Sequence, residues 1–249
     1  MLNVLLCGCY GHMGKIVTEI LYERADITLI GVDGMPSQGV ANFPIFTSFD
    51  DVNIASDVII DFSHHTLILS LLDYAERSKT PAVICTTGLD EEIHARMKDV
   101  AESVPILHSG NMSVGVNLLL KLVRQAAAVL TDNFDIELIE RHHNRKLDAP
   151  SGTAYMIADA INEELNSSKY YTFGRKGKDT KRKAEEIAIH SVRGGTIVGE
   201  HSVIFAGTDE VIEISHKAYS RRLFAVGAVK AARFLVKQEP GLYSMDDVL

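Results

Sequence analysis

The first 33 residues constrain the fold more strongly than any other stretch of the chain. Residues 2–7 are a short apolar run of the kind that forms buried parallel strands. A glycine-rich segment, residues 8–15, comes next, followed by a helical pattern of apolar residues and a second apolar run at 27–32 that ends in Asp33. This order of strand, glycine turn, helix, strand and acidic residue is typical of a dinucleotide-binding Rossmann unit.

The spacing of the glycines departs from the usual G-x-G-x-x-G pattern, because Tyr10 stands where the second glycine would be. Glycines in this turn allow the backbone to approach a pyrophosphate at the helix N-terminus, and an acid about 20 residues further on can bind the ribose. Asp33 is placed for that role. We therefore predict cofactor contacts from Gly8, Cys9, Tyr10, Gly11, His12, Met13 and Asp33.

Strand and helix patterns continue to alternate as far as residue 112, with strands expected at 56–62, 81–85 and 104–107 and helices at 66–77 and 90–102. Ser63 is expected to cap the first of these helices, with His64 and His65 exposed. An open α/β sheet binds its ligands at the carboxyl ends of its strands. The nicotinamide half is therefore expected to contact Cys85, Thr86, Thr87, Ser109, Gly110, Asn111 and Met112, although plain connecting loops explain these turns equally well.

The pattern changes after a long apolar helix expected at 113–131, in which Val114, Leu118, Leu122 and Ala126 lie in register. Strands are expected at 134–143, 185–192, 196–206 and 210–217, and a helix at 151–166. Short glycine-containing turns join the last three strands, which predicts antiparallel pairing. The fold class is therefore α/β: a doubly wound parallel sheet (1–112, completed by a C-terminal helix within 218–249) and a second α+β domain (113–217) with an open mixed sheet of about four strands.

Residues 137–154, E-L-I-E-R-H-H-N-R-K-L-D-A-P-S-G-T-A, carry the densest group of reactive side chains. His142, His143, Lys146 and Asp148 lie between the end of a strand and the start of a helix. Ser151 or Thr153 can cap this helix, which would leave the N–H groups of residues 152–154 facing outward as an anion site. Positive side chains beside a helix N-terminus suit a carboxylate or phosphate substrate.

A metal site is the alternative interpretation of this segment, because it contains four residues of metal-ligand type: Glu137, Glu140, His142 and Asp148. On a strand, however, Glu140 and His142 face one way while Arg141 and His143 face the other. Arg141, Arg145 and Lys146 also add positive charge where a cation would bind. We therefore predict no metal site.

Charge and cysteine content narrow the range of possible binding partners and cellular environments. The net charge of −8 argues against nucleic acid as a main partner, and no apolar run is long enough to span a bilayer. Residues 1–6 lack the basic region of a signal peptide, and three cysteines without zinc-type spacing suit a reducing cytoplasm. The basic run at 175–183 is interpreted as a solvated loop, or as one that steers an anionic substrate.

Taken together, these segments resemble the 4-hydroxy-tetrahydrodipicolinate reductase family, formerly called dihydrodipicolinate reductase. Gly8 to Lys15 is similar to the G-x-x-G-x-M-G turn of the family, and Glu137 to Ala154 to its long signature. Residues 198–201 and 216–218 resemble further family segments. The resemblance covers nearly the whole chain and implies a Rossmann cofactor domain and a substrate domain whose sheets assemble a homotetramer.

The resemblance also implies a reaction, in which a hydride from NADH or NADPH moves to C4 of a cyclic imine dicarboxylate and the 4-hydroxyl leaves as water. It implies that His142 and Lys146 are catalytic, His142 as a proton donor or acceptor and Lys146 as a proton donor and partner of the substrate's charge. His143, Gly152 and Thr153 would bind the substrate carboxylates, and Asp148 would orient Lys146 or cap the turn rather than react. This reaction serves lysine and diaminopimelate biosynthesis.

One departure from the family concerns the cofactor. Members that prefer NADPH often carry arginine after the ribose acid and in the glycine turn, whereas this chain has Gly34 and His12. We therefore expect NADH to serve at least as well as NADPH. Two other functions remain open from the sequence alone: another NAD(P) oxidoreductase of a small carboxylate, and a dinucleotide-sensing module without catalysis.

Overall fold

The computed structural model describes residues 1–34, 42–130 and 133–249. The Cα positions divide the chain into two compact units. Unit 1 contains Met1–Val114 and Arg222–Leu249, and unit 2 contains Gly115–Arg221. The boundaries expected from the sequence were 112/113 and 217/218. Each unit is described by itself.

Unit 1 is built on a parallel sheet, and in the described residues this sheet has seven strands in the order β12-β6-β5-β4-β1-β2-β3. The strands are β1 (Leu2–Cys7), β2 (Ile27–Val32), β3 (Ile45–Phe46), β4 (Val58–Asp61), β5 (Ala82–Ile84), β6 (Pro105–His108) and β12 (Gly241–Tyr243). The order reverses between β1 and β4, as in a doubly wound Rossmann sheet. The predicted fold of this half is confirmed, although the sequence analysis missed the two edge strands β3 and β12.

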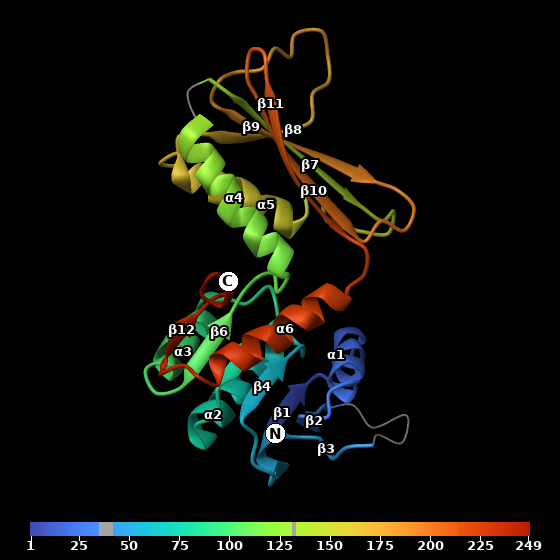
Figure 1. Ribbon diagram of the computed structural model, residues 1–249, viewed down its shortest axis with the longest axis vertical. Coiled ribbons are helices and arrows are strands. Elements are labelled where there is room, and N and C mark those ends of the chain that lie inside the picture. The colour runs from blue at the N-terminus through green and yellow to red at the C-terminus, as the bar shows by residue number, and fades with distance from the viewer. Residues whose placement is uncertain (35–41, 131–132) are drawn as a thin grey trace. The chain divides into compact units, whose positions relative to one another are not determined.

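Helices cover both faces of this sheet (Figure 1). Helices α1 (His12–Tyr22) and α6 (Arg222–Leu235) pack on one face with the short α7 (Met245–Val248), and α2 (Ile68–Ser78) and α3 (Glu91–Ala101) pack on the other. Successive residues of β1 belong to the two cores in turn, because side chains alternate across a strand. Helix α6 thus belongs to the same compact unit as the first sheet. The described residues of this unit also contain the 3₁₀ turns Phe49–Asp51 and His65–Leu67.

Unit 2 contains a five-stranded mixed sheet in the order β11-β10-β7-β9-β8. Its strands are β7 (Asp135–His142), β8 (Tyr170–Phe173), β9 (Glu186–Arg193), β10 (Gly199–Ala206) and β11 (Val211–Ala218). Helices α4 (Val114–Leu130) and α5 (Gly152–Glu164) lie side by side on one face of it (Figure 1). The open mixed sheet is confirmed, with one strand, β8, more than the four expected.

Two predicted details of unit 2 are wrong. Strand β9 does not pair with β10: it pairs in parallel with β7, which separates the two. The predicted stripe of α4 is also wrong, because its buried face carries Val116, Leu119 and Val123 while Leu118 and Leu122 are exposed. Residue 131, the expected last residue of this helix, lies outside the described residues.

Candidate active site

The glycine turn after β1 is shaped by close backbone packing. Gly8 has φ +74°, a conformation that side chains disfavour, and a Cβ there would lie 2.6 Å from the carbonyl oxygen of Phe62. A Cβ on Gly14 would lie 2.1 Å from the oxygen of Gly8. Both positions therefore require glycine, and the turn comes close to the end of β4 at the point where the strand order reverses.

Asp33 is tied directly to this turn. The backbone N–H of Tyr10 donates to Asp33 Oδ2 at 2.9 Å, and the carboxylate is largely buried at the carboxyl end of β2. The N–H of Asp33 donates in turn to the oxygen of Phe46 on β3. The predicted ribose acid and the predicted pyrophosphate turn are therefore held in one hydrogen-bonded arrangement.

A pocket of about 370 Å³ opens beside the turn, at the carboxyl ends of the central strands. It brings together five of the predicted cofactor residues, His12, Met13, Cys85, Thr86 and Thr87. Its other walls are Phe62, Ser63, His64 and His65, which the sequence analysis did not assign to the site. The predicted residues 109–112 follow β6 and lie outside this lining.

The segment after β4 is held by a buried carboxylate, Asp61. It accepts hydrogen bonds from Ser63 and from the hydroxyl of Thr86 at 2.6 Å. Burial raises the pKa of Asp61, although these hydrogen bonds oppose the rise. The expectation that Ser63 caps the next helix is therefore wrong, because its side chain is turned to Asp61 and the ring of His64 accepts the capping bond.

The three cysteines of unit 1 are free and buried. Burial raises the pKa of the Cys9 thiol to about 11 and raises those of Cys7 and Cys85 as well, so the thiols stay protonated at neutral pH. The side chain of Cys9 belongs to the core. Cys9 and Cys85 can therefore meet a dinucleotide mainly through their backbones.

In unit 2, β7 turns Glu140 and His142 toward the buried face of the sheet, as its alternation predicts. The neighbouring strand makes room for the histidine ring at Gly199, where a Cβ would lie 3.1 Å from His142 Nε2. His142 is 9% exposed, whereas His143 is half-buried. The two adjacent histidines therefore have different surroundings.

Glu140 is fully buried and accepts hydrogen bonds from several elements. Its Oε2 lies 2.6 Å from His142 Nδ1, and Arg193 on β9 donates to both carboxylate oxygens at 2.6 and 2.7 Å. The backbone N–H of Ser151 donates to Oε1 at 3.2 Å. Arg193 was missed from the sequence, since only the parallel pairing of β7 with β9 brings it to the site.

Lys146 and Asp148 form an ion pair in the loop that follows β7. Lys146 Nζ lies 2.8 Å from Asp148 Oδ1, and the hydrogen bond from Lys146 lowers the pKa of Asp148. The N–H of Lys146 donates to the oxygen of His143 at 3.1 Å. This geometry supports Asp148 as the residue that orients Lys146.

The loop ends at the start of α5, where Ser151 is the cap. Its hydroxyl accepts from the N–H of Ala154 at 3.1 Å. The expectation of three outward N–H groups is therefore wrong for Ala154, whose N–H is taken by Ser151. Gly152 is exposed and Thr153 is half-buried.

Positive charge gathers around His143. Partial desolvation lowers the pKa of His143, and the charges of Arg145, Arg221, His142 and Lys146 lower it further. Arg221 follows β11 and is far from the signature in sequence, so the sequence analysis missed it. This concentration of positive charge suits an anionic ligand at His143.

A further histidine, His201 on β10, lies opposite Glu140 in the pairing of β10 with β7. It is 4% exposed, its Nε2 lies 3.0 Å from Ser151 Oγ, and its ring meets that of His142 edge to face with centroids 5.3 Å apart. Burial is the main cause that lowers its pKa, to about 3. His201 is therefore a neutral hydrogen-bonding partner of the helix cap.

The buried His201 predicts a pH-dependent stability. Its pKa rises from about 3 when folded to roughly 6.5 when unfolded. The unfolded state therefore binds more protons below pH 6.5, and stability falls by about 1.4 kcal/mol per unit as the pH decreases. Between pH 7 and pH 5, His201 should lower the free energy of unfolding by about 2 kcal/mol. Urea unfolding of the wild type and His201→Gln at both pH values would measure the difference, and equal losses in the two proteins would contradict the prediction.

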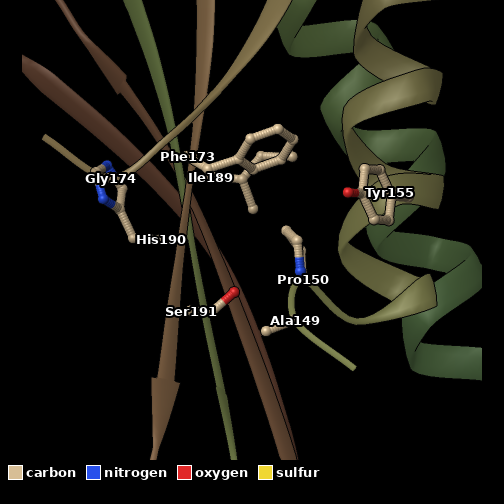
Figure 2. Close-up of a pocket in the computed structure, with 8 residues that line it drawn as sticks. All are labelled: Ala149, Pro150, Tyr155, Phe173, Gly174, Ile189, His190 and Ser191. Atoms are coloured by element: carbon tan, nitrogen blue, oxygen red, sulfur yellow. The ribbon is translucent and has the colours of Figure 1, made fainter. Parts of the chain in front are cut away.

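A second hollow of about 590 Å³ lies between α5 and the edge of the unit 2 sheet (Figure 2). Tyr155 on α5 faces Phe173, Ile189 and Pro150 across it. Ala149 and Pro150 of the signature form part of its wall, and His190 and Ser191 another part, whereas His142, His143 and Lys146 lie outside this lining. The hollow therefore adjoins the signature segment at Ala149 and Pro150 without including these three side chains in its lining.

The described residues contain neither a metal-binding cluster of side chains nor a membrane-crossing helix. Within residues 1–34, 42–130 and 133–249, no group of three or more His, Cys, Asp or Glu side chains is arranged to hold a metal ion. None of the helices in this part of the chain is long and apolar enough to cross a membrane.

Comparison with known proteins identifies the family. Residues 2–112 match the family model described as dihydrodipicolinate reductase, N-terminus, and residues 115–249 match the model for the C-terminus. The chain belongs to the dihydrodipicolinate reductase family. It is 49% identical to the 4-hydroxy-tetrahydrodipicolinate reductase of Caldanaerobacter subterraneus subsp. tengcongensis and 45% identical to that of Clostridium botulinum, over 100% of this chain and 98% of each relative.

A solved structure of the same family has the same fold. The dipicolinate-bound dihydrodipicolinate reductase from Paenisporosarcina sp. TG-14 superposes with a TM-score of 0.85 at 26% identity, covering 100% of both chains. The recognition of the family from the glycine turn and the signature is thereby confirmed.

Proposed function

We propose that this chain catalyses the NAD(P)H-dependent reduction of 4-hydroxy-tetrahydrodipicolinate to tetrahydrodipicolinate, a step of lysine and diaminopimelate biosynthesis. The observation that carries the proposal is the folded signature, residues 137–154, in a chain that both family models match. One NAD(P)H and one proton are consumed, and the 4-hydroxyl group leaves as water.

The residues of unit 1 fit a dinucleotide cofactor. Gly8 and Gly14 leave no room for a Cβ where the backbone would approach a pyrophosphate, and Asp33 is held beside the turn by Tyr10. The bound cofactor would supply the hydride. The pocket of His12, Met13 and Cys85–Thr87 is proposed to hold its nicotinamide half, with Ser109–Met112 as a further wall.

The residues of unit 2 are proposed to bind the dicarboxylate and to handle the proton. His143, Gly152 and Thr153 would bind carboxylates within the positive charge around His143. His142, whose Nδ1 is bonded to Glu140, would give or take a proton at Nε2. Lys146, held by Asp148, would donate a proton as the hydride reaches C4. Positioned acids of this kind contribute about 10²–10⁴-fold to rate. The dipicolinate in the structure from Paenisporosarcina sp. TG-14 supports a small dicarboxylate as ligand.

We also propose a domain organisation, an assembly and a location for this chain. Residues 1–112 with 218–249 would form the cofactor domain, and residues 113–217 the substrate and tetramerisation domain. A homotetramer is supported by the sheet face of unit 2 opposite to α4 and α5, which carries the partly exposed Ile139 and Ile204. A cytoplasmic location is supported by the three free cysteines.

The reaction can be tested with purified protein and substrate generated in situ from pyruvate and aspartate semialdehyde by the upstream synthase. Oxidation of NADH or NADPH, followed at 340 nm, should be rapid only when the synthase is present. Folded protein that oxidises neither cofactor under these conditions would remove the proposal.

The cofactor preference is a separate prediction. The Asp33 carboxylate would repel a 2′-phosphate, and Gly34 offers no compensating charge. We expect kcat/KM for NADH to equal or exceed that for NADPH. Asp33→Asn removes only the charge and should raise the relative efficiency of NADPH. A preference of the wild type for NADPH above about tenfold, or 1.4 kcal/mol, would contradict the prediction.

A further inference from the structure

One buried carboxylate, that of Glu140, connects the separate pieces of the signature. Through Oε2 it reaches His142 on its own strand, and through Oε1 it reaches the N–H of Ser151 at the start of α5. Arg193 donates to both oxygens from β9 and also to the backbone oxygen of Asp148 at 2.7 Å. Strand, loop and helix start are therefore joined at a single point.

The charge state of Glu140 decides how the His142 ring is used. Burial raises the pKa of Glu140, but hydrogen bonds from His142, Arg193 and Ser191 outweigh that effect and hold the pKa well below its usual range. An ionised carboxylate can only accept hydrogen bonds. His142 Nδ1 must therefore carry a proton in this contact, which leaves Nε2 as the nitrogen that gains or loses a proton.

Arg193 completes the arrangement by holding the carboxylate in a two-pronged contact. Its side chain is 19% exposed and that of Glu140 is 0% exposed, so the pair is well shielded from water. Removing either partner would leave the other charge buried and unpaired. The pair also fixes the loop between His142 and Ser151, because Arg193 bonds Asp148, whose side chain holds Lys146.

We propose that Glu140 and Arg193 are positioning residues that fix the Nδ1–H tautomer of His142 and hold Lys146 and the start of α5 in their catalytic arrangement. This proposal rests on the function proposed above. Neither residue needs to touch the substrate, since both act through His142, Asp148 and Ser151.

Strand β7 itself offers a matched control on its opposite face. Glu137 contacts a histidine, His190, at 2.7 Å, and two arginines, Arg175 and Arg182, at 2.9 and 3.1 Å. The same types of side chain therefore meet there, on the face of β7 opposite to Glu140 and His142. Glu137→Gln and Glu140→Gln make the same chemical change on the two faces.

Histidine tautomers can be measured directly by ¹⁵N NMR on protein labelled at histidine, with His142→Gln used to assign the signal. We expect wild-type His142 to carry its proton on Nδ1 when neutral, and Glu137→Gln to leave that signal unchanged. A wild-type His142 protonated on Nε2 instead would overturn the proposal. This outcome is independent of turnover, so it separates a failure of the positioning proposal from a failure of the proposed function.

Steady-state kinetics provide the second measurement. They are made only on variants whose circular dichroism spectra and light-scattering masses match those of the wild type. In Glu140→Gln an amide N–H₂ group replaces one carboxylate oxygen. This donor would then face two other donors, one from Arg193 and one from either His142 or Ser151. We expect kcat to fall about 10²-fold, the cost of a small misplacement, with KM for NADH unchanged. Arg193→Lys should retain more activity than Arg193→Met. A kcat for Glu140→Gln within threefold of the wild type, or an equal loss in Glu137→Gln, would overturn the proposal.

Discussion

Replacing Lys146 with alanine is expected to lower kcat by about 10²–10⁴-fold, the usual contribution of a positioned acid. Lys146 is the proposed proton donor, and its Nζ is held 2.8 Å from Asp148 rather than left mobile. NADH binding should be retained, because the residues proposed to hold the dinucleotide belong to unit 1. The synthase-coupled assay would measure turnover, and a fluorescence titration would measure the affinity for NADH.

Lys230→Ala is the matched control, since it makes the same change of charge at an exposed position on α6. It should turn over at the wild-type rate. A Lys146→Ala variant with wild-type turnover would exclude the assigned proton donor. A protein that binds NADH with no turnover even as wild type would instead support a dinucleotide-sensing module.

Gly227→Ala is expected to destabilise unit 1 severely. Alanine is normally better than glycine inside a helix by about 1 kcal/mol, so propensity alone predicts a gain. In α6, however, a Cβ at position 227 would lie 1.7 Å from the backbone oxygen of Met112. Because a backbone atom cannot move aside like the tip of a side chain, we expect a loss of 3 kcal/mol or more, at or beyond the usual upper range for overpacking.

Thermal unfolding followed by circular dichroism would measure this effect. A loss of about 3 kcal/mol should lower Tm by roughly 6–12 °C in a chain of this size. The neighbouring Val226 is 46% exposed, and Val226→Ala should change Tm by no more than a few degrees. If Gly227→Ala melted at or above the wild-type temperature, the close packing of α6 against Met112 would be refuted.

The fold of unit 1 could be predicted because each element carries its own signal. Buried parallel strands are continuous apolar runs, and the glycine turn and Asp33 mark the first crossover. The edge strand β3 has only two residues, Ile45–Phe46, and β12 only three, which is too short for a periodic pattern to develop. Both were missed for that reason.

Unit 2 was predicted less completely, because its pairing is decided between distant segments. Residues 186–193 and 199–206 are joined by a short glycine-containing turn, which normally indicates a hairpin. Instead β7 lies between them, since it pairs with both strands. The exposed face of α4 was mistaken for its buried face, because leucines at positions 118 and 122 look the same in sequence whether or not a partner element covers them.

The residues of the candidate site also differ in how well the sequence predicts them. His142, Lys146, Asp148 and Ser151 are close in sequence, so their mutual arrangement follows from one strand end and one helix start. Three other residues come from distant parts of the chain: Arg193 lies on β9, His201 on β10, and Arg221 just after β11. No local motif marks Arg193 or Arg221, and His201 lies in the segment 198–201, which resembles the family but suggested no role for this residue. The pairing of β7 with β9 and β10 brings Arg193 and His201 near the signature.

The return of the last segment to unit 1 has a consequence for synthesis on the ribosome. Helix α6 and strand β12 lie in residues 222–249, yet α6 fills one face of the first sheet and β12 closes the edge of β6. A nascent chain that has emerged only as far as residue 114 therefore lacks part of its core and presents an open strand edge, which is a template for wrong pairing. The unit whose translation starts first is thus completed last, after all of unit 2 has been made.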